Sequence, residues 1–176
     1  MRAGKVAAAV GATACVLGGG SVALAASSPK GGKVNIYVTP KTSIKDQVLV
    51  TGAIGDYGTA ISQNASGKPS PNGTFENVRL KQGGFIVNAT GLNNKINKAK
   101  PRVNKTTCSV VFKVTGPAAV GDGRGAYKGI SGNLKITVTF AGVASKTAKG
   151  CNFSSNAPLH GMYQSITGSG TVKFIK

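Results

Sequence analysis

The chain carries a glycine-rich run, GDGRGAYKGISG at residues 121–132, directly ahead of the segment LKITVTF at residues 134–140. Every second residue from Leu134 to Phe140 is apolar, and lysine or threonine stands between them, which predicts a strand with one buried face. Glycines ahead of such a strand tolerate a sharp bend or bulge, with Tyr127 packed against the neighbouring strand. The two segments together predict a corner of a curved antiparallel sheet.

The same period-two alternation recurs along most of the chain. It predicts strands at residues 33–39, 47–54, 108–115 and 134–140, and weaker ones at 58–63, 75–81, 84–89, 126–130, 162–166 and 171–175. Turn-forming residues lie between them, as in GDYG at 55–58, QGG at 82–84 and GDG at 121–123. We therefore expect an all-β fold, an antiparallel β-barrel of about eight strands, with a β-sandwich as the alternative.

The composition limits the chemistry. The 176 residues contain 22 Lys and Arg against 4 Asp and Glu, with 26 Gly, 1 His and a formal net charge of +18. Four acids and one histidine leave little material for acid–base catalysis, and His160 has no Asp or Cys at metal spacing. We expect no catalytic residues, no metal and no cofactor, and we lean towards a protein that is not an enzyme.

The N-terminus has the layout of a secretory signal peptide. Arg2 and Lys5 precede an uncharged stretch at residues 6–25 that ends on the small-residue triplet Ala-Leu-Ala. We expect cleavage after residue 25 and a single secreted domain at 26–176 that keeps 20 bases, 4 acids and a net charge of +16. The alternatives are a membrane anchor through the uncleaved segment or a lipid on Cys15.

Cleavage would also leave two cysteines, Cys108 and Cys151. An even pair in a secreted chain predicts one disulfide.

The glycine-rich run at 121–132 resembles the G-x-G-x-[YF]-x-G-x-x-G hairpin of the allene oxide cyclase and dirigent barrel superfamily, in the form found in secreted actinobacterial proteins. The GDYG turn at 55–58 is similar to a turn in that family. The resemblance spans about 25 residues around 121–140 and implies an eight-stranded barrel with a pocket at one mouth. No functional residue is carried over, because the strand at 33–39 has no acid and none of the four acids aligns with the family's pocket acids.

Glu76 is the acid with two possible placements. In a strand at 75–81 it shares a face with Val78 and Leu80, which would make it a pocket acid inside the barrel. The alternative is that the strand begins one residue later, so that Glu76 lies at the solvated rim and pairs with a lysine.

The charge gives the main functional indication. Residues 93–105 concentrate it, and we expect a mobile loop there rather than a helix, because asparagines are poor helix formers. The loop would be the contact for a polyanion, through Lys95, Lys98, Lys100, Arg102 and Lys105. The expected function is a secreted cationic barrel that binds an anionic extracellular partner: cell-wall polymer, polysaccharide, lipid headgroup or nucleic acid. The alternative is a barrel for a small hydrophobic ligand, either a carrier or an isomerase like the allene oxide cyclases.

Overall fold

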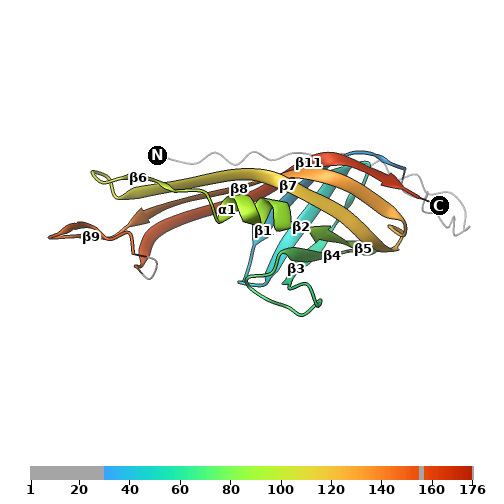
Figure 1. Ribbon diagram of the computed structural model, residues 1–176, viewed down its shortest axis with the longest axis horizontal. Coiled ribbons are helices and arrows are strands. Elements are labelled where there is room, and N and C mark those ends of the chain that lie inside the picture. The colour runs from blue at the N-terminus through green and yellow to red at the C-terminus, as the bar shows by residue number, and fades with distance from the viewer. Residues whose placement is uncertain (1–29, 155–156, 176) are drawn as a thin grey trace, which may run out of the picture.

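The computed structural model describes residues 30–154 and 157–175, and the predicted signal segment with Cys15 lies outside them. Eleven strands and one helix are found in these residues (Figure 1). They are β1 (Gly32–Pro40), β2 (Lys45–Gly52), β3 (Asp56–Gln63), β4 (Phe75–Leu80), β5 (Gly83–Asn88), α1 (Thr90–Ile96), β6 (Arg102–Asn104), β7 (Ser109–Gly125), β8 (Ile130–Ala144), β9 (Lys146–Thr147), β10 (Gly150–Cys151) and β11 (Leu159–Phe174).

Eight of these strands form a closed antiparallel barrel. The order is β5-β4-β3-β2-β1-β11-β8-β7, and pairing of β5 with β7 closes the ring. The prediction of an all-β barrel is therefore confirmed, and the sandwich alternative is wrong. The alternating apolar residues fill the interior: Val34, Val48 and Val50 are almost fully buried, while the residues between them on β1 and β2 are mostly exposed.

Three strands are longer than the sequence predicted. β7, β8 and β11 have 17, 15 and 16 residues, so the segments predicted at 162–166 and 171–175 are one strand. The predicted strand at 126–130 and the predicted turn at 121–123 are wrong, because residues 126–129 form the turn and 121–123 belong to β7. A bulge explains the shift: Asp122 has a φ of 52°, and the register between β5 and β7 slips beside it.

The long strands project beyond the barrel as a wing, which consists of residues 102–113, 139–154 and 157–165 (Figure 1). β7 pairs with β5 only from Ala119 onwards, and β11 pairs with β1 only from Ile166 onwards. In the wing, β7 pairs instead with the short strand β6, and β9 and β10 form a small hairpin near its tip. The wing is thus an open sheet attached to a closed barrel.

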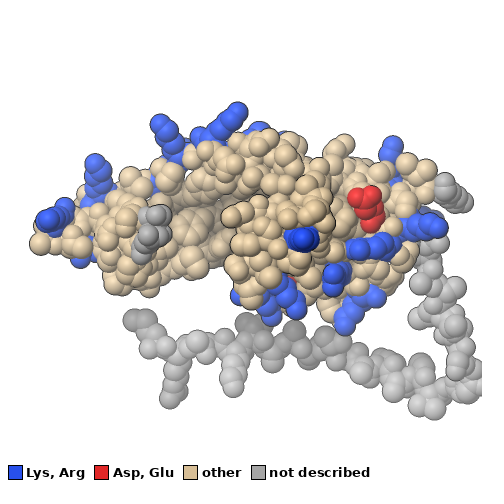
Figure 2. Space-filling view, turned by 60° about the horizontal axis from the view of Figure 1, so that its bottom comes forward, with Lys and Arg blue, Asp and Glu red and all other residues tan. Residues whose placement is uncertain are grey.

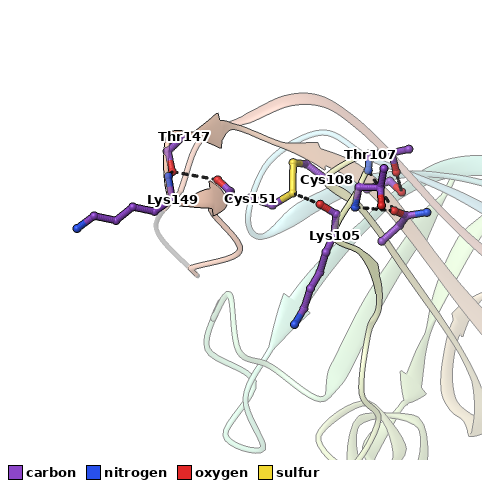
Figure 3. The surroundings of a disulfide bond; sticks show 10 residues. Lys105, Thr107, Cys108, Thr147, Lys149 and Cys151 are labelled. Carbon is purple, nitrogen blue, oxygen red and sulfur yellow. Dashed lines mark hydrogen bonds between the residues drawn. A yellow bond between two sulfur atoms is a disulfide. The ribbon is translucent and has the colours of Figure 1, made fainter.

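The disulfide fastens the wing. Cys108 and Cys151 are bonded with 5.2 Å between their Cα atoms, which confirms the predicted bridge. The bond joins the chain just ahead of β7 to the end of β10, and Cys151 Sγ lies 3.0 Å from the Lys105 carbonyl oxygen (Figure 3). Cys108 also accepts a backbone hydrogen bond from Ala144 at 2.8 Å. The bridge therefore fixes the tip hairpin to the body of the wing.

The expectation of a loop at 93–105 is wrong in two places. α1 continues to Ile96, and Arg102–Asn104 forms β6. The helix buries Leu92 against the core and packs against β7, and Asn88 Oδ1 accepts the Thr90 N–H at 3.0 Å just ahead of it. Tertiary burial therefore outweighs the low helix propensity of the asparagines.

One end of the barrel is closed by a buried polar contact. Tyr127 donates a hydrogen bond of 2.6 Å from its hydroxyl to Asp56 Oδ2, and its ring packs edge-on against Phe85 at 5.9 Å. The Asp56 carboxylate also accepts backbone N–H bonds from Tyr57, Lys81 and Gln82. These contacts join the start of β3, the turn between β4 and β5, and the turn between β7 and β8.

We predict that Tyr127→Phe lowers the free energy of unfolding by about 1–3 kcal/mol, because it removes a donor from a buried carboxylate. Urea denaturation measures the change. Tyr57→Phe is the matched control: Tyr57 is 57% exposed, so its substitution should shift stability by less than about 0.5 kcal/mol. Equal effects of the two substitutions would contradict a structural role for the Tyr127 hydroxyl.

We predict that the double substitution Cys108→Ala and Cys151→Ala loosens the wing before the barrel. The bridged residues are 43 positions apart, which sets an upper limit of about 4 kcal/mol on the chain-entropy stabilisation. Hydrogen exchange should show lost amide protection in residues 145–152, with β1 and β2 unchanged. Uniform loss over barrel and wing would contradict separate opening of the wing.

Candidate functional site

The four acids and the many bases are sorted between the inside and the outside of the molecule. Asp56 is 4% exposed at the closed end, while Asp46 and Glu76 are half-buried and line the interior. Only Asp122 is exposed. Lysine and arginine side chains, in contrast, project from the wing and from the barrel (Figure 2). The surface is therefore more cationic than the overall charge balance indicates.

The structure does not gather the five predicted contact residues into one cluster. Lys95 lies in the last turn of α1, which packs beside Gly116 of β7, whereas Arg102 lies on β6 opposite Val111. Lys105 lies further along the wing, next to the disulfide. Since a strand rises about 3.4 Å per residue, the set extends over more than about 15 Å along β7. All five side chains are exposed, but they are spread over this length and do not form one compact patch.

A broad groove lies on the outer face of the barrel, beside α1. Its volume is about 960 Å³, and it runs across β7, β8 and β11. Three lysines line it: Lys95 from α1, Lys135 from β8 and Lys173 from β11. A second depression of about 330 Å³ continues from it towards Tyr37 and shares Lys135. Of the five predicted contact residues, Lys95 is the one that lines this groove.

The groove and the second depression present neutral hydrogen-bonding groups in register between the lysines. Thr115, Thr137 and Thr167 lie side by side across β7, β8 and β11, and the hydroxyls of Thr115 and Thr137 are 2.8 Å apart. The next row contains Lys135 and Ser169. Hydroxyls both donate and accept hydrogen bonds, so this face suits a ligand that is both charged and hydroxylated.

The opposite face of β8 and β11 borders a cavity inside the barrel, at the mouth next to the wing. The cavity has a volume of about 100 Å³ and is lined by apolar side chains together with Asp46 and Glu76. Of the two placements considered for Glu76, the structure has the inward one: it shares the interior face of β4 with Val78. Its Oε2 atom is buried and has no hydrogen-bond partner among the described residues.

The surroundings change the acidity of the interior acids. Burial raises the pKa of Glu76 to about 7, against an opposing hydrogen bond from Ser62, and the nearby Asp46 raises it further. Burial also raises the pKa of Asp46. Burial alone would raise the pKa of Asp56, but the hydrogen bonds from Tyr127 and three backbone N–H groups outweigh it and hold that pKa below its usual value. Glu76 thus titrates near neutral pH.

Two further observations concern a metal site and a membrane-spanning helix. His160 is exposed on β11, and within residues 30–154 and 157–175 no three His, Cys, Asp or Glu side chains come together as metal ligands would. The described part of the chain contains no helix that is long and apolar enough to span a bilayer.

Three residues of these sites were missed by the sequence analysis. Asp46 alternates with Val48 and Val50 on β2, so the inward face of that strand could have been extended back to it. Lys135 and Lys173 are ordinary outward-facing strand residues. They come to line one groove only because β8 and β11 pair with each other. The pairing of strands is not encoded in their alternation.

The fold and the site define a closed eight-stranded antiparallel barrel with an outer basic groove and an inner acidic cavity. Comparison of the chain with protein-family models, with curated proteins and with solved structures finds no match. The resemblance to allene oxide cyclases and dirigent proteins therefore stays a prediction from the glycine-rich run.

We predict that stability falls as pH rises from about 4.5 to 7. In this window the folded state keeps the Glu76 proton that the unfolded state has lost, so the loss approaches about 3 kcal/mol at 1.36 kcal/mol per pKa unit. The raised pKa of Asp46 acts in the same direction, whereas the lowered pKa of Asp56 acts only at more acidic pH.

Denaturant unfolding at a series of pH values measures this slope. Glu76→Gln should flatten it, because glutamine keeps the shape of the side chain without ionising. Asp122→Asn makes the same chemical change at an exposed acid and should leave the slope as in the unchanged protein. An unaltered slope in Glu76→Gln would contradict the assignment.

Proposed function

We propose that the protein is a secreted, non-enzymatic binding protein for an anionic extracellular polymer, and that the polymer lies in the outer groove. The observation that carries this proposal is the groove itself, with three lysines placed around a floor of hydroxyl and amide groups. Three of the four acids face inwards or are buried, so little negative charge competes at the surface.

The kind of cation in this chain favours recognition of a polymer by its negative charge over recognition of a nucleic acid by its base sequence. Of the 20 bases in residues 26–176, 17 are lysines and 3 are arginines. Lysine acts as a compact point charge, whereas bidentate recognition of bases or single carboxylates uses the arginine fork. Threonine, serine and asparagine on the groove floor would bond to sugar hydroxyls. An anionic polysaccharide or sugar-phosphate polymer therefore fits this face better than a specific nucleic-acid sequence does.

Binding to such a polymer should depend steeply on salt and on the groove lysines. We predict that the triple variant Lys95→Gln, Lys135→Gln and Lys173→Gln elutes from a heparin column at clearly lower salt and binds heparin at least about tenfold more weakly. Each lost contact should reduce the slope of log K against log salt by somewhat under one unit.

Two matched triple variants remove the same charge elsewhere. Lys98→Gln, Lys100→Gln and Lys105→Gln tests predicted contact bases that do not line the groove, and Lys41→Gln, Lys68→Gln and Lys149→Gln tests other exposed lysines away from it. Both should lose less affinity than the groove variant. Equal losses in all three would show diffuse attraction and contradict the groove, and failure of the unchanged protein to bind heparin at low salt would contradict the function.

A further inference from the structure

The interior cavity is a second environment with a chemistry of its own. It opens at the mouth of the barrel that faces the wing, and the closed end beyond it is filled by the core around Tyr127. Apolar side chains from strands around the barrel and Leu92 of α1 form its walls. Among the residues that line it, Asp46 and Glu76 supply the charge, and none is basic.

The Glu76 carboxyl group is poorly compensated where it lies, whereas the nearby Asp46 accepts a backbone hydrogen bond from Lys41. Glu76 Oε2 is fully buried and has no partner among the residues described, although the Ser62 hydroxyl bonds to the same side chain. Asp46 lies close enough to influence it electrostatically. A buried carboxylate without a partner costs free energy, and its cost is removed by a donor or cation that enters the cavity.

We propose that this cavity binds a small ligand in which a primary ammonium group is attached to a short apolar chain or ring, with the ammonium group between Glu76 and Asp46. An ammonium group has three donors and one positive charge, which suits two neighbouring carboxyl groups. A carboxylate or phosphate would be repelled, and an alcohol would leave the negative charge uncompensated.

The size of the cavity limits the apolar part of the ligand. Its volume of about 100 Å³ is below the roughly 150 Å³ of an apolar protein cavity that holds benzene. A chain of about four or five carbons therefore fits, whereas a long fatty chain does not. The walls that would contact this chain include Val78, Val87, Ile136 and Ile166.

Binding should be linked to protons. An ammonium group pairs with ionised Glu76, so affinity for the amine should rise as the pH passes through about 7 and a proton should be released. Asp46 from β2 and Ser62 from β3 are the polar groups that face Glu76, while the lining contributed by β5, α1, β8 and β11 is apolar. The amine itself stays protonated throughout this range.

Calorimetric titration with n-butylamine, n-butanol and butyrate tests the proposal on the intact protein at pH 6 and pH 8. We expect butylamine to bind at least tenfold more tightly than butanol at pH 8, with affinity lower at pH 6, and butyrate not to bind. Glu76→Gln should weaken butylamine at least tenfold, whereas Asp122→Asn, the same change at an exposed acid, should bind it as the unchanged protein does.

The proposal is overturned if butanol binds as tightly as butylamine, if none of the three compounds binds, or if Glu76→Gln leaves butylamine binding unchanged. If Glu76→Gln does not fold, Asp46→Asn and the pH series on the unchanged protein test the proposal instead. Asp46→Asn should weaken butylamine binding, and the unchanged protein should bind butylamine more tightly at pH 8 than at pH 6; the absence of both effects overturns the proposal. The cavity and the groove lie on opposite faces of β8 and β11, so heparin retention measured beside these titrations tells a failure here from a failure of the proposed function.

Discussion

The hydrogen bond from Tyr127 to Asp56 is the contact on which the rest of the barrel depends. Asp56 is one of the four acidic residues of the chain, yet it is buried. Its carboxylate accepts hydrogen bonds from three backbone N–H groups as well as from the tyrosine hydroxyl. Apart from Tyr57, which follows Asp56 on β3, the donors belong to turns that are far apart in sequence, so one side chain joins several barrel strands. Because this end is closed, the other end is where a cavity can form, and the long strands continue there as the wing.

Closure also determines how charge is distributed. In a closed barrel every strand has one face inside and one outside, so an acid and a base of one strand can be separated by the wall, as Glu76 and Arg79 of β4 are. β8 shows the principle: Ile136 and Val138 border the cavity, while Lys135 and Thr137, which alternate with them, border the groove and the second depression. The strong imbalance of the sequence becomes stronger on the surface, because most of the acids face inwards.

Sequence periodicity predicted much of this architecture, but it did not predict the features that depend on long-range strand pairing. The alternation in β1, β2 and β8, the disulfide and the bulged corner before Tyr127 all follow from local pattern or cysteine count. The length of β7 and β11 does not, since glycines such as Gly168 and Gly170 interrupt the apolar pattern while the backbone pairing continues. α1 was missed for a related reason: Leu92 forms a helix because β7 offers a surface on which to bury it.

The two sites therefore share one wall and remain chemically independent. A side chain that faces the groove cannot reach the cavity, because successive residues of a strand point to opposite faces. Lys135 and Ile136 are adjacent in the chain, yet one borders a polar, cationic groove and the other an apolar, acidic cavity. We therefore expect substitutions of the outer lysines to leave the interior packing unchanged, and substitution of Glu76 to leave the charge of the outer groove unchanged. The alternation that encodes the barrel thus also separates a basic outer groove from an acidic inner cavity within one small domain.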